Sequence, residues 1–227
     1  MTLNELIYRI IGVYRAKHKN TDNLSTRLVE SWIHSTRSLI VRQRLDKEIF
    51  TIEEAYVQDL GPQELEAIDS SIVLSIPSGK VMKRTKDPIP QPVTLGKGIP
   101  GFLRVGPADR MEANFKTVSY EAALVSGYGK FNSKDIYSFY LDNHLYFISK
   151  DWNYFRQLDY VDVRGIFQDP TEAGYTDYDE PYPISYNIVE LMEDHIIKNR
   201  LPLVISGLAD ETANERDDVV NLQSQDA

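Results

Sequence analysis

The sequence contains no cysteine. This absence excludes a disulfide framework, a thiolate zinc site and a cysteine nucleophile, and it agrees with a protein made in a cytoplasm. Long apolar runs are missing as well. Residues 1–20 carry Asn4, Glu5 and Arg9 among their apolar positions. We therefore expect an amphipathic helix there, and neither a signal peptide nor a membrane span.

Signatures of catalysis and metal binding are also absent. The acidic stretch 177–180 lacks the glycine and the terminal glutamate of a calcium-binding EF-hand loop. No glycine-rich phosphate loop and no nucleophile elbow occurs. The histidines share no ligand spacing; they are His18, His34, His144 and His195. The sequence therefore predicts no catalytic residue, no metal site and no cofactor.

The net charge of −9 is unevenly distributed. Residues 1–50 hold nine Lys/Arg against five Asp/Glu, and residues 51–167 hold thirteen against fifteen. Residues 168–227 hold three against fourteen. The plain interpretation is a solvated surface with an acidic tail. The alternative is a subunit whose basic and acidic ends meet different neighbours.

Two amphipathic helices are predicted at the beginning of the chain. Helical spacing runs through residues 4–17 and again through 25–46. The predicted buried stripe of the first comprises Leu3, Leu6, Ile7, Ile10, Ile11 and Tyr14. That of the second comprises Leu28, Trp32, Ile33, Leu39 and Ile40. A short polar connection suggests an antiparallel helical hairpin.

What the chain has in abundance is aromatic residues, concentrated in residues 136–170. Apolar and polar residues alternate in 137–141, the dipeptide Asp142-Asn143 follows, and the run Leu145–Ile148 returns. This is a strong signal for a β-hairpin, with a further strand before a stop at 168–170. We expect both packed and exposed aromatic surface here, which suits assembly better than catalysis. Other predicted strands are 50–60, 72–76, 80–84, 102–105, 114–120 and 122–127, with turns at Gly61-Pro62 and Ser78-Gly79.

Residues 87–101 carry four prolines and three glycines, which predict a loop or an edge excursion. A third helix is predicted over 185–199, with Ile188, Leu191, Met192 and Ile196 on one face. From about residue 207 the chain is acidic and has no core pattern, which is typical of an arm. The predicted class is α+β: a helical hairpin (1–47), a β-sandwich or small barrel (48–183), and a C-terminal helix with an acidic arm (184–227).

Candidate interface residues lie at both ends of the chain. Arg37, Arg42 and Arg44 on the second helix are predicted to meet acidic or carbonyl groups of neighbouring chains. In the acidic arm, Val219, Val220 and Leu222 form a short apolar anchor. A DNA-binding adaptor that uses the basic helical hairpin is the alternative, although its helices commit apolar residues to packing and the whole chain is acidic.

Three segments resemble virion proteins of tailed phages, especially crAss-like podoviruses. They are TDNLSTRLVESWIHSTRSLIVRQRLDK (21–47), YSFYLDNHLYFIS…YVDVRGIFQDPTEAG (137–174), and YPISYNIVELMEDHIIKNRL with the acidic run after it (182–217). Their ranges take in 101 of the 227 residues, in the family's order. The stretch 87–101 matches nothing in that pattern.

The resemblance implies a structural ring or adaptor subunit of the head-to-tail connector, made in the host cytoplasm and located at the portal vertex or tail of the virion. Copies would form a cyclic, dodecameric ring between the portal and neighbouring ring or tail proteins. Genome DNA would pass through its lumen without sequence-specific binding, and no membrane would be involved. A tail-completion protein outside the connector is a further alternative.

Overall fold

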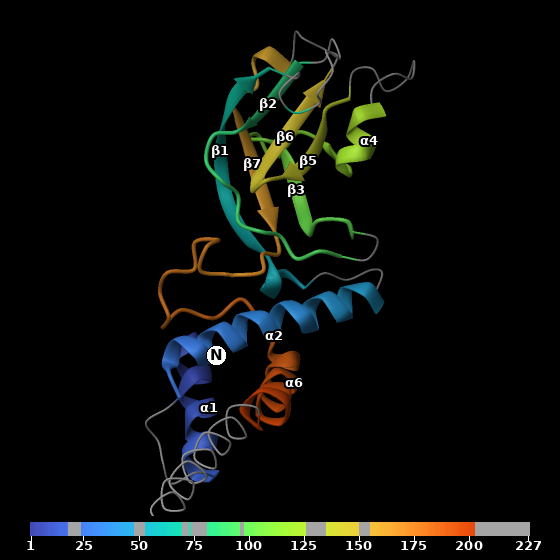
Figure 1. Ribbon diagram of the computed structural model, residues 1–227. Helices are drawn as coiled ribbons and strands as arrows, with labels where there is room; N and C mark the ends of the chain where they lie inside the picture. The colour runs from blue at the N-terminus through green and yellow to red at the C-terminus, as the bar shows by residue number, and fades with distance from the viewer. Residues whose placement is uncertain are drawn as a thin grey trace, which may run out of the picture. The chain divides into compact units, whose positions relative to one another are not determined.

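The computed structural model describes residues 1–17, 24–47, 53–69, 73, 81–95, 98–125, 135–149 and 155–202 (Figure 1). They fall into two compact units. The first comprises Met1–Arg37 with the described part of Tyr178–Ala227, and the second comprises the described part of Ser38–Asp177. The first unit therefore joins two parts of the chain that are remote in sequence.

Helix α1 (Leu3–Lys17) begins with a reciprocal capping box. Thr2 Oγ1 accepts a hydrogen bond from the Glu5 amide at 3.2 Å, and Glu5 Oε2 accepts one from the Thr2 amide at 2.9 Å. The pair satisfies two amide donors at the helix start. The predicted apolar stripe is confirmed, since all six of its residues are buried: Leu3, Leu6, Ile7, Ile10, Ile11 and Tyr14.

Helix α2 (Thr26–Lys47) buries most of the predicted face, with differences at two positions. Leu28 and Leu39 are each 38% exposed, whereas Val29 and Val41 are fully buried. Trp32, Ile33 and Ile40 are buried as predicted. The prediction counted the large apolar residues, but the buried stripe also takes in the small or polar positions Thr36 and Arg37. Figure 1 shows α1 steeply inclined to α2, so the two do not lie side by side as the predicted antiparallel hairpin.

The first unit is completed by helix α6 (Tyr186–His195) and a π-helical turn, η3 (Ile196–Arg200). Ile188, Met192 and Ile196 are buried, as predicted. Leu191 is instead exposed, and Val189 takes its place on the buried face. The segment before α6 is bound to α1, because Tyr182 N donates to Met1 O at 3.0 Å and Asn4 Nδ2 to Asp179 Oδ1 at 2.8 Å.

The second unit is a nearly closed barrel-like sheet, which decides between the two predicted β architectures. Its order is β3-β7-β1-β2-β6-β5-β4. The bounds are β1 Gln58–Ile68, β2 Val81–Thr85, β3 Phe102–Pro107, β4 Lys116–Thr117, β5 Tyr137–Leu141, β6 His144–Ser149 and β7 Tyr160–Gly165. The two ends approach each other where Phe115 N donates to Val105 O at 2.8 Å. Figure 1 shows β1 curving along the whole side of this sheet.

The aromatic hairpin is confirmed as β5 and β6. Its turn residues Asp142 and Asn143 have φ values of 47° and 60°, the left-handed conformation that a two-residue type I′ turn requires. Phe139 and Tyr146 face each other across the strands and stack, with ring centroids 5.2 Å apart. The aromatic residues of the hairpin are packed, because β6 is buried on both faces, whereas Tyr160 at the start of β7 is 51% exposed.

Both faces are buried because the hairpin contributes to two cores. Leu145 and Phe147 point into the barrel interior with Val105, Val161 and Val163. Tyr146 and Ile148 point outward, into a second cluster that includes Phe139, Met82 and Ala123. The short helix α4 (Tyr120–Val125) covers that outer cluster.

Two predicted elements differ in the structure. The turn at Gly61-Pro62 is absent, because β1 continues through it with a bulge between Asp59 and Gly61. Gly61 adopts φ of 66°, which glycine tolerates. The predicted strand 122–127 is helical over α4, whose first turn is capped by Ser119 Oγ accepting from the Ala122 amide at 3.3 Å.

Other strand boundaries also moved. The predicted strand 50–60 begins in the structure with a 3-10 turn, Glu54–Tyr56, and its strand residues belong to β1. The predicted strand 114–120 is reduced to β4, which pairs parallel with β5. The predicted strand 72–76 lies outside the described residues except for Val73, and so does the predicted turn at Ser78-Gly79.

The proline- and glycine-rich stretch is an edge excursion, as predicted. Its two arms form an isolated bridge between Thr94 and Pro100, and Leu95 N donates to Ile99 O at 2.8 Å. The excursion is joined to the residues after β7 by Val93 N to Ile166 O at 2.8 Å and Ile166 N to Gly101 O at 2.9 Å. Gly101 is required there, since a Cβ would lie 2.7 Å from Val93 O.

Candidate functional site

The predicted interface arginines have different environments. Arg37 is fully buried. Its Nε donates to Pro183 O at 2.6 Å, and its guanidinium carbon lies 5.8 Å from the centroid of the Tyr182 ring. Next to it, His34 Nδ1 lies 2.7 Å from Tyr182 Oη. Arg37 therefore ties α2 to the segment before α6 within its own unit.

Arg42 and Arg44 are accessible. The Arg42 side chain is 56% exposed and lies 3.9 Å from Asp46, one turn further along α2. Arg44 Nη1 lies 4.0 Å from Glu53 Oε1. At these distances both ion pairs are weak, so both side chains can exchange partners at little cost. The predicted anchor of the arm, Val219, Val220 and Leu222, lies outside the described residues.

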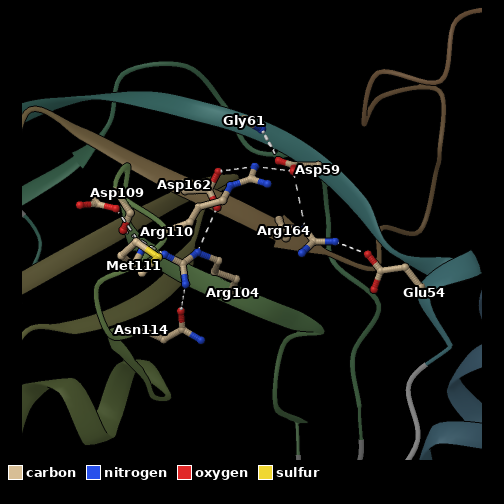
Figure 2. Close-up of polar contacts among 10 residues, drawn as sticks. All are labelled: Glu54, Asp59, Gly61, Arg104, Asp109, Arg110, Met111, Asn114, Asp162 and Arg164. Atoms are coloured by element: carbon tan, nitrogen blue, oxygen red, sulfur yellow. Dashed lines mark hydrogen bonds and ion pairs between the residues drawn. The ribbon is translucent and has the colours of Figure 1, made fainter.

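A polar cluster among the described residues of the second unit covers the outer face of β3, β7 and the start of β1 (Figure 2). We call it the arginine network: Arg104, Arg110 and Arg164 with Glu54, Asp59 and Asp162. The register pairs Arg104 with Arg164 and Gly106 with Asp162. The side chains of Arg104, Arg164 and Asp162 therefore share one face of the sheet. The intervening Val105, Val161 and Val163 point inward.

Asp162 is the centre of the arginine network. Its carboxylate is only 2% exposed, yet it receives two guanidinium groups, Arg104 Nε at 3.1 Å and Arg110 Nη2 at 2.9 Å. Figure 2 shows both arginines converging on it. A buried carboxylate is costly unless it is paired and hydrogen-bonded, and here each of its oxygens has a cationic donor.

Arg104 uses all three of its nitrogens. Besides Asp162, it donates through Nη1 to Asn114 Oδ1 at 2.8 Å and through Nη2 to Asp109 O at 3.3 Å. Asp109 Oδ1 in turn accepts from the Met111 amide at 2.9 Å. One arginine thereby fixes residues 108–114, the connection between β3 and β4, onto the barrel wall.

Asp59 extends the network to β1. Arg110 Nη2 lies 2.5 Å from Asp59 Oδ2, and Arg164 Nε lies 3.6 Å from the same oxygen. Arg164 also pairs with Glu54. Burial alone would raise the pKa of Asp59, but hydrogen bonds from the Gly61 amide and Arg110, together with the charges of Arg110 and Arg164, hold that pKa below its ordinary value. The same two carboxylates, Asp59 and Asp162, raise the pKa of Arg110.

The chemistry of the network is structural. Its three cations face three carboxylates, so the described side chains present a neutralised cluster rather than a site for a free anion. No group of three or more metal-ligating side chains occurs among the described residues. Within the same ranges, no helix is long and apolar enough to cross a membrane.

The sequence reasoning missed the arginine network. The available signal was the pattern Val161-Asp162-Val163-Arg164, in which charged residues alternate with core valines. That pattern places charges on the outer face of a strand, but it does not identify partners that lie about 50 to 110 positions away along the chain.

The described residues thus form a barrel-like β unit reinforced by ion pairs, in a chain that also carries a helical unit. The chain belongs to the family of phage tail ring protein 2 of crAss-like phages, whose model matches residues 5–219. The match spans both units and confirms the resemblance seen in the sequence. No match was found among curated proteins. The chain is thus a structural ring protein of a phage tail, a virion component of a kind that is not typically an enzyme.

Proposed function

We propose that this ring protein is a subunit of the head-to-tail connector, in which copies form a closed homo-oligomeric ring stacked coaxially with the portal. The observation that carries the proposal is the family match over residues 5–219, which includes both units. Ring closure needs two different complementary faces on each copy. A ring aligned with the portal would contain about twelve copies, the usual connector symmetry.

The charge of the chain fits a channel for DNA. The net charge is −9. We therefore expect a low affinity for DNA, since proteins gain that affinity from lysine and arginine contacts to phosphates. A lumen of this character lets genome DNA pass without sequence-specific binding and without retaining it. The ring would lie at the portal vertex, against the portal and neighbouring ring or tail proteins.

Contacts between copies are assigned to accessible residues. Arg42 and Arg44 suit this role, because their intrachain ion pairs are long. Arg37 does not, since it is buried against Pro183 and Tyr182. Val219, Val220 and Leu222 in the acidic arm supply an apolar anchor for an adjacent subunit, and acidic residues around them complement cationic positions such as Arg42.

The DNA-binding alternative is weakened by the same burial. A recognition helix needs its arginines at the surface, and Arg37 in α2 donates to a backbone carbonyl of its own chain. Arg27, Arg42 and Arg44 remain, which is few contacts for a protein of net negative charge. A tail-completion protein outside the connector differs from the proposed function only in its location.

Symmetry-averaged images of purified virions test the proposal. We expect density for both units in a cyclic ring coaxial with the portal. Finding the chain elsewhere in the tail would favour the tail-completion protein, and its absence from the particle would end the proposal. Titration with duplex DNA at physiological salt separates the second candidate: we expect negligible binding, whereas sub-micromolar, steeply salt-dependent binding would favour a DNA adaptor.

A further inference from the structure

Residues 108–114, which we call the Met111 loop, present one large apolar side chain, Met111, on a loop that hydrogen bonds hold in place. Met111 is 93% exposed. The loop beneath it is held by hydrogen bonds from Arg104 to the Asp109 carbonyl and to the Asn114 side chain, and by one that the Met111 amide donates to Asp109 Oδ1. Figure 2 shows the loop folded over the arginine network. An isolated exposed methionine is ordinary, but one presented on a backbone fixed in this way is not.

Such a fixed apolar tip suits an interface. An element that is already ordered loses little conformational entropy on docking, so more of its contact energy appears as affinity. Methionine adapts to irregular apolar surfaces and makes favourable contacts with aromatic rings. We therefore expect the Met111 loop to bind in a groove that contains aromatic residues.

A groove of about 300 Å³ with that lining lies elsewhere on the same barrel. It lies between the proline- and glycine-rich excursion and the start of α4, and its walls include Pro92, Pro100, Tyr120 and Tyr140. Both tyrosines are fixed by hydrogen bonds to backbone carbonyls, Tyr120 to Val73 and Tyr140 to Ile89. The groove is thus as well ordered as the loop.

The loop and the groove are separate surfaces of the barrel, and Met111, which is 93% exposed, does not fill the groove of its own copy. The loop covers β3, β7 and β1, which are neighbours at one end of the sheet order. The groove is lined by the residues that follow β4 and by Tyr140 of β5, at the other end of that order. A knob and a groove made of different residues fit head-to-tail contacts between successive copies of a ring, because such contacts join two unlike surfaces.

Charge supports the same pairing. Arg110, next to Met111, has a half-exposed side chain, and both of its ion pairs use Nη2. The guanidinium has further N–H donors on Nε and Nη1. Glu121 lines the groove and is exposed. With Met111 in the groove, Arg110 and Glu121 would bring opposite charges together at its rim.

We propose that the Met111 loop of one copy docks into the groove between the excursion and α4 of the next copy, joining successive subunits of the ring. The occupant of the groove is thus a second copy of this chain. This inference rests on the proposed function, and it adds which surfaces meet. It also gives a role to the excursion 87–101, whose hydrogen bonds to the barrel position one wall of the groove.

The absence of cysteine allows a direct test by disulfide cross-linking. Virions carrying the double variant Met111→Cys with Thr94→Cys, where Thr94 lines the groove, are oxidised mildly and run on a non-reducing gel. We expect a ladder of covalent oligomers that collapses on reduction. The single variants are the controls, since neither can give more than a dimer.

Oxidised virions that contain the ring but show only monomers of the double variant would overturn the inference and leave the proposed function intact. Absence of the unmodified chain from virions, by contrast, would remove the proposed function itself. The two failures are therefore distinguishable.

A second measurement covers the case in which the cysteine variants are not incorporated. Met111→Glu should reduce incorporation into virions at least about tenfold, whereas the matched control Tyr186→Glu, an exposed residue of α6 in the other unit, should not. Glu121→Arg changes only the groove, and on its own it should also be incorporated poorly into virions. Normal assembly of Met111→Glu would overturn the inference.

Discussion

Arg104 Nε lies 3.1 Å from Asp162 Oδ2, on the outer face of the barrel, and the carboxylate is 2% exposed. This contact joins β3 to β7 by side chains in addition to their backbone ladder. It also buries a charge that would be strongly unfavourable without its partners. The strands and the Met111 loop are therefore coupled through one carboxylate.

Removing that carboxylate should be costly. We expect Asp162→Ala to destabilise the second unit by about 3–5 kcal/mol, the usual cost of leaving a buried charge uncompensated, as measured by denaturant unfolding. The matched control is Asp159→Ala in the segment before β7. Asp159 is 74% exposed and only 3.6 Å from Lys83 Nζ, so its loss should cost within about 1 kcal/mol. Equal costs for the two variants would mean that the network is not a source of stability.

Asp59 predicts a pH dependence with a definite sign. Its pKa is lowered from the ordinary value of 3.8 in spite of its burial, through Gly61, Arg110 and Arg164. A carboxyl whose pKa is depressed by folding contributes stability above its unfolded pKa and loses it as the pH falls through the folded pKa. We expect the unfolding free energy of Asp59→Asn to fall less steeply below pH 4 than that of the unmodified chain. If the unfolding free energies of the two proteins fall with the same slope below pH 4, the prediction is wrong.

Two glycines should respond to alanine with opposite signs. In Gly101→Ala the new Cβ would meet Val93 O at 2.7 Å, a backbone atom that cannot move aside. We expect a loss of about 1–3 kcal/mol, as in other overpacked sites. Gly12 lies within α1 with nothing within 4 Å of its added Cβ, so Gly12→Ala should gain about 0.5–1 kcal/mol. Thermal unfolding of both variants measures the contrast, and a stable Gly101→Ala protein would refute the close approach.

The arginines of α2 should separate assembly from folding. The double variant Arg42→Gln with Arg44→Gln is expected to keep its melting temperature, because its intrachain ion pairs are long, but to enter virions about tenfold less well. Arg37→Gln should instead lower stability by about 1–3 kcal/mol, since it disturbs a buried hydrogen-bonding group. Arg156→Gln, at an exposed position of the second unit, is the control. Normal incorporation of the double variant would remove Arg42 and Arg44 from the interface.

The acidic arm gives a prediction from sequence alone. Deleting residues 209–227 should leave the melting temperature within a few degrees, because the arm has too few apolar residues to build a core. Ring formation should weaken, since Val219, Val220 and Leu222 are lost. Virion yield with the truncated chain is the measurement, with Val219→Asp, Val220→Asp as a milder variant. Unchanged yield would identify the arm as a solvated tail.

Local patterns predicted the elements whose geometry is set by near neighbours. The stripe from Leu3 to Tyr14 determined α1, and Asp142-Asn143 determined the β5–β6 hairpin, because helical periodicity and turn chemistry act within a few residues. Elsewhere a local signal competed with a longer-range one. Gly61-Pro62 reads as a turn, yet β7 pairs through it and makes it a bulge.

The family was accessible from the sequence, and the arginine network was not. Segments of the chain carry the resemblance in their order and composition, which do not depend on the fold. The network depends on it completely, since Asp162 acquires Arg104 and Arg110 only when β3 and the Met111 loop are brought against β7.

The sequence by itself determined the α+β class, the two leading helices, the aromatic hairpin and the excursion at 87–101, because each follows from spacing, turn residues or proline content nearby. Only the tertiary structure decided that the sheet nearly closes into a barrel, that Arg37 is buried while Met111 is exposed, and that a groove forms beside Tyr120 and Tyr140. These outcomes are set by which strands pair and which faces are covered, and such long-range contacts have no signature in adjacent residues.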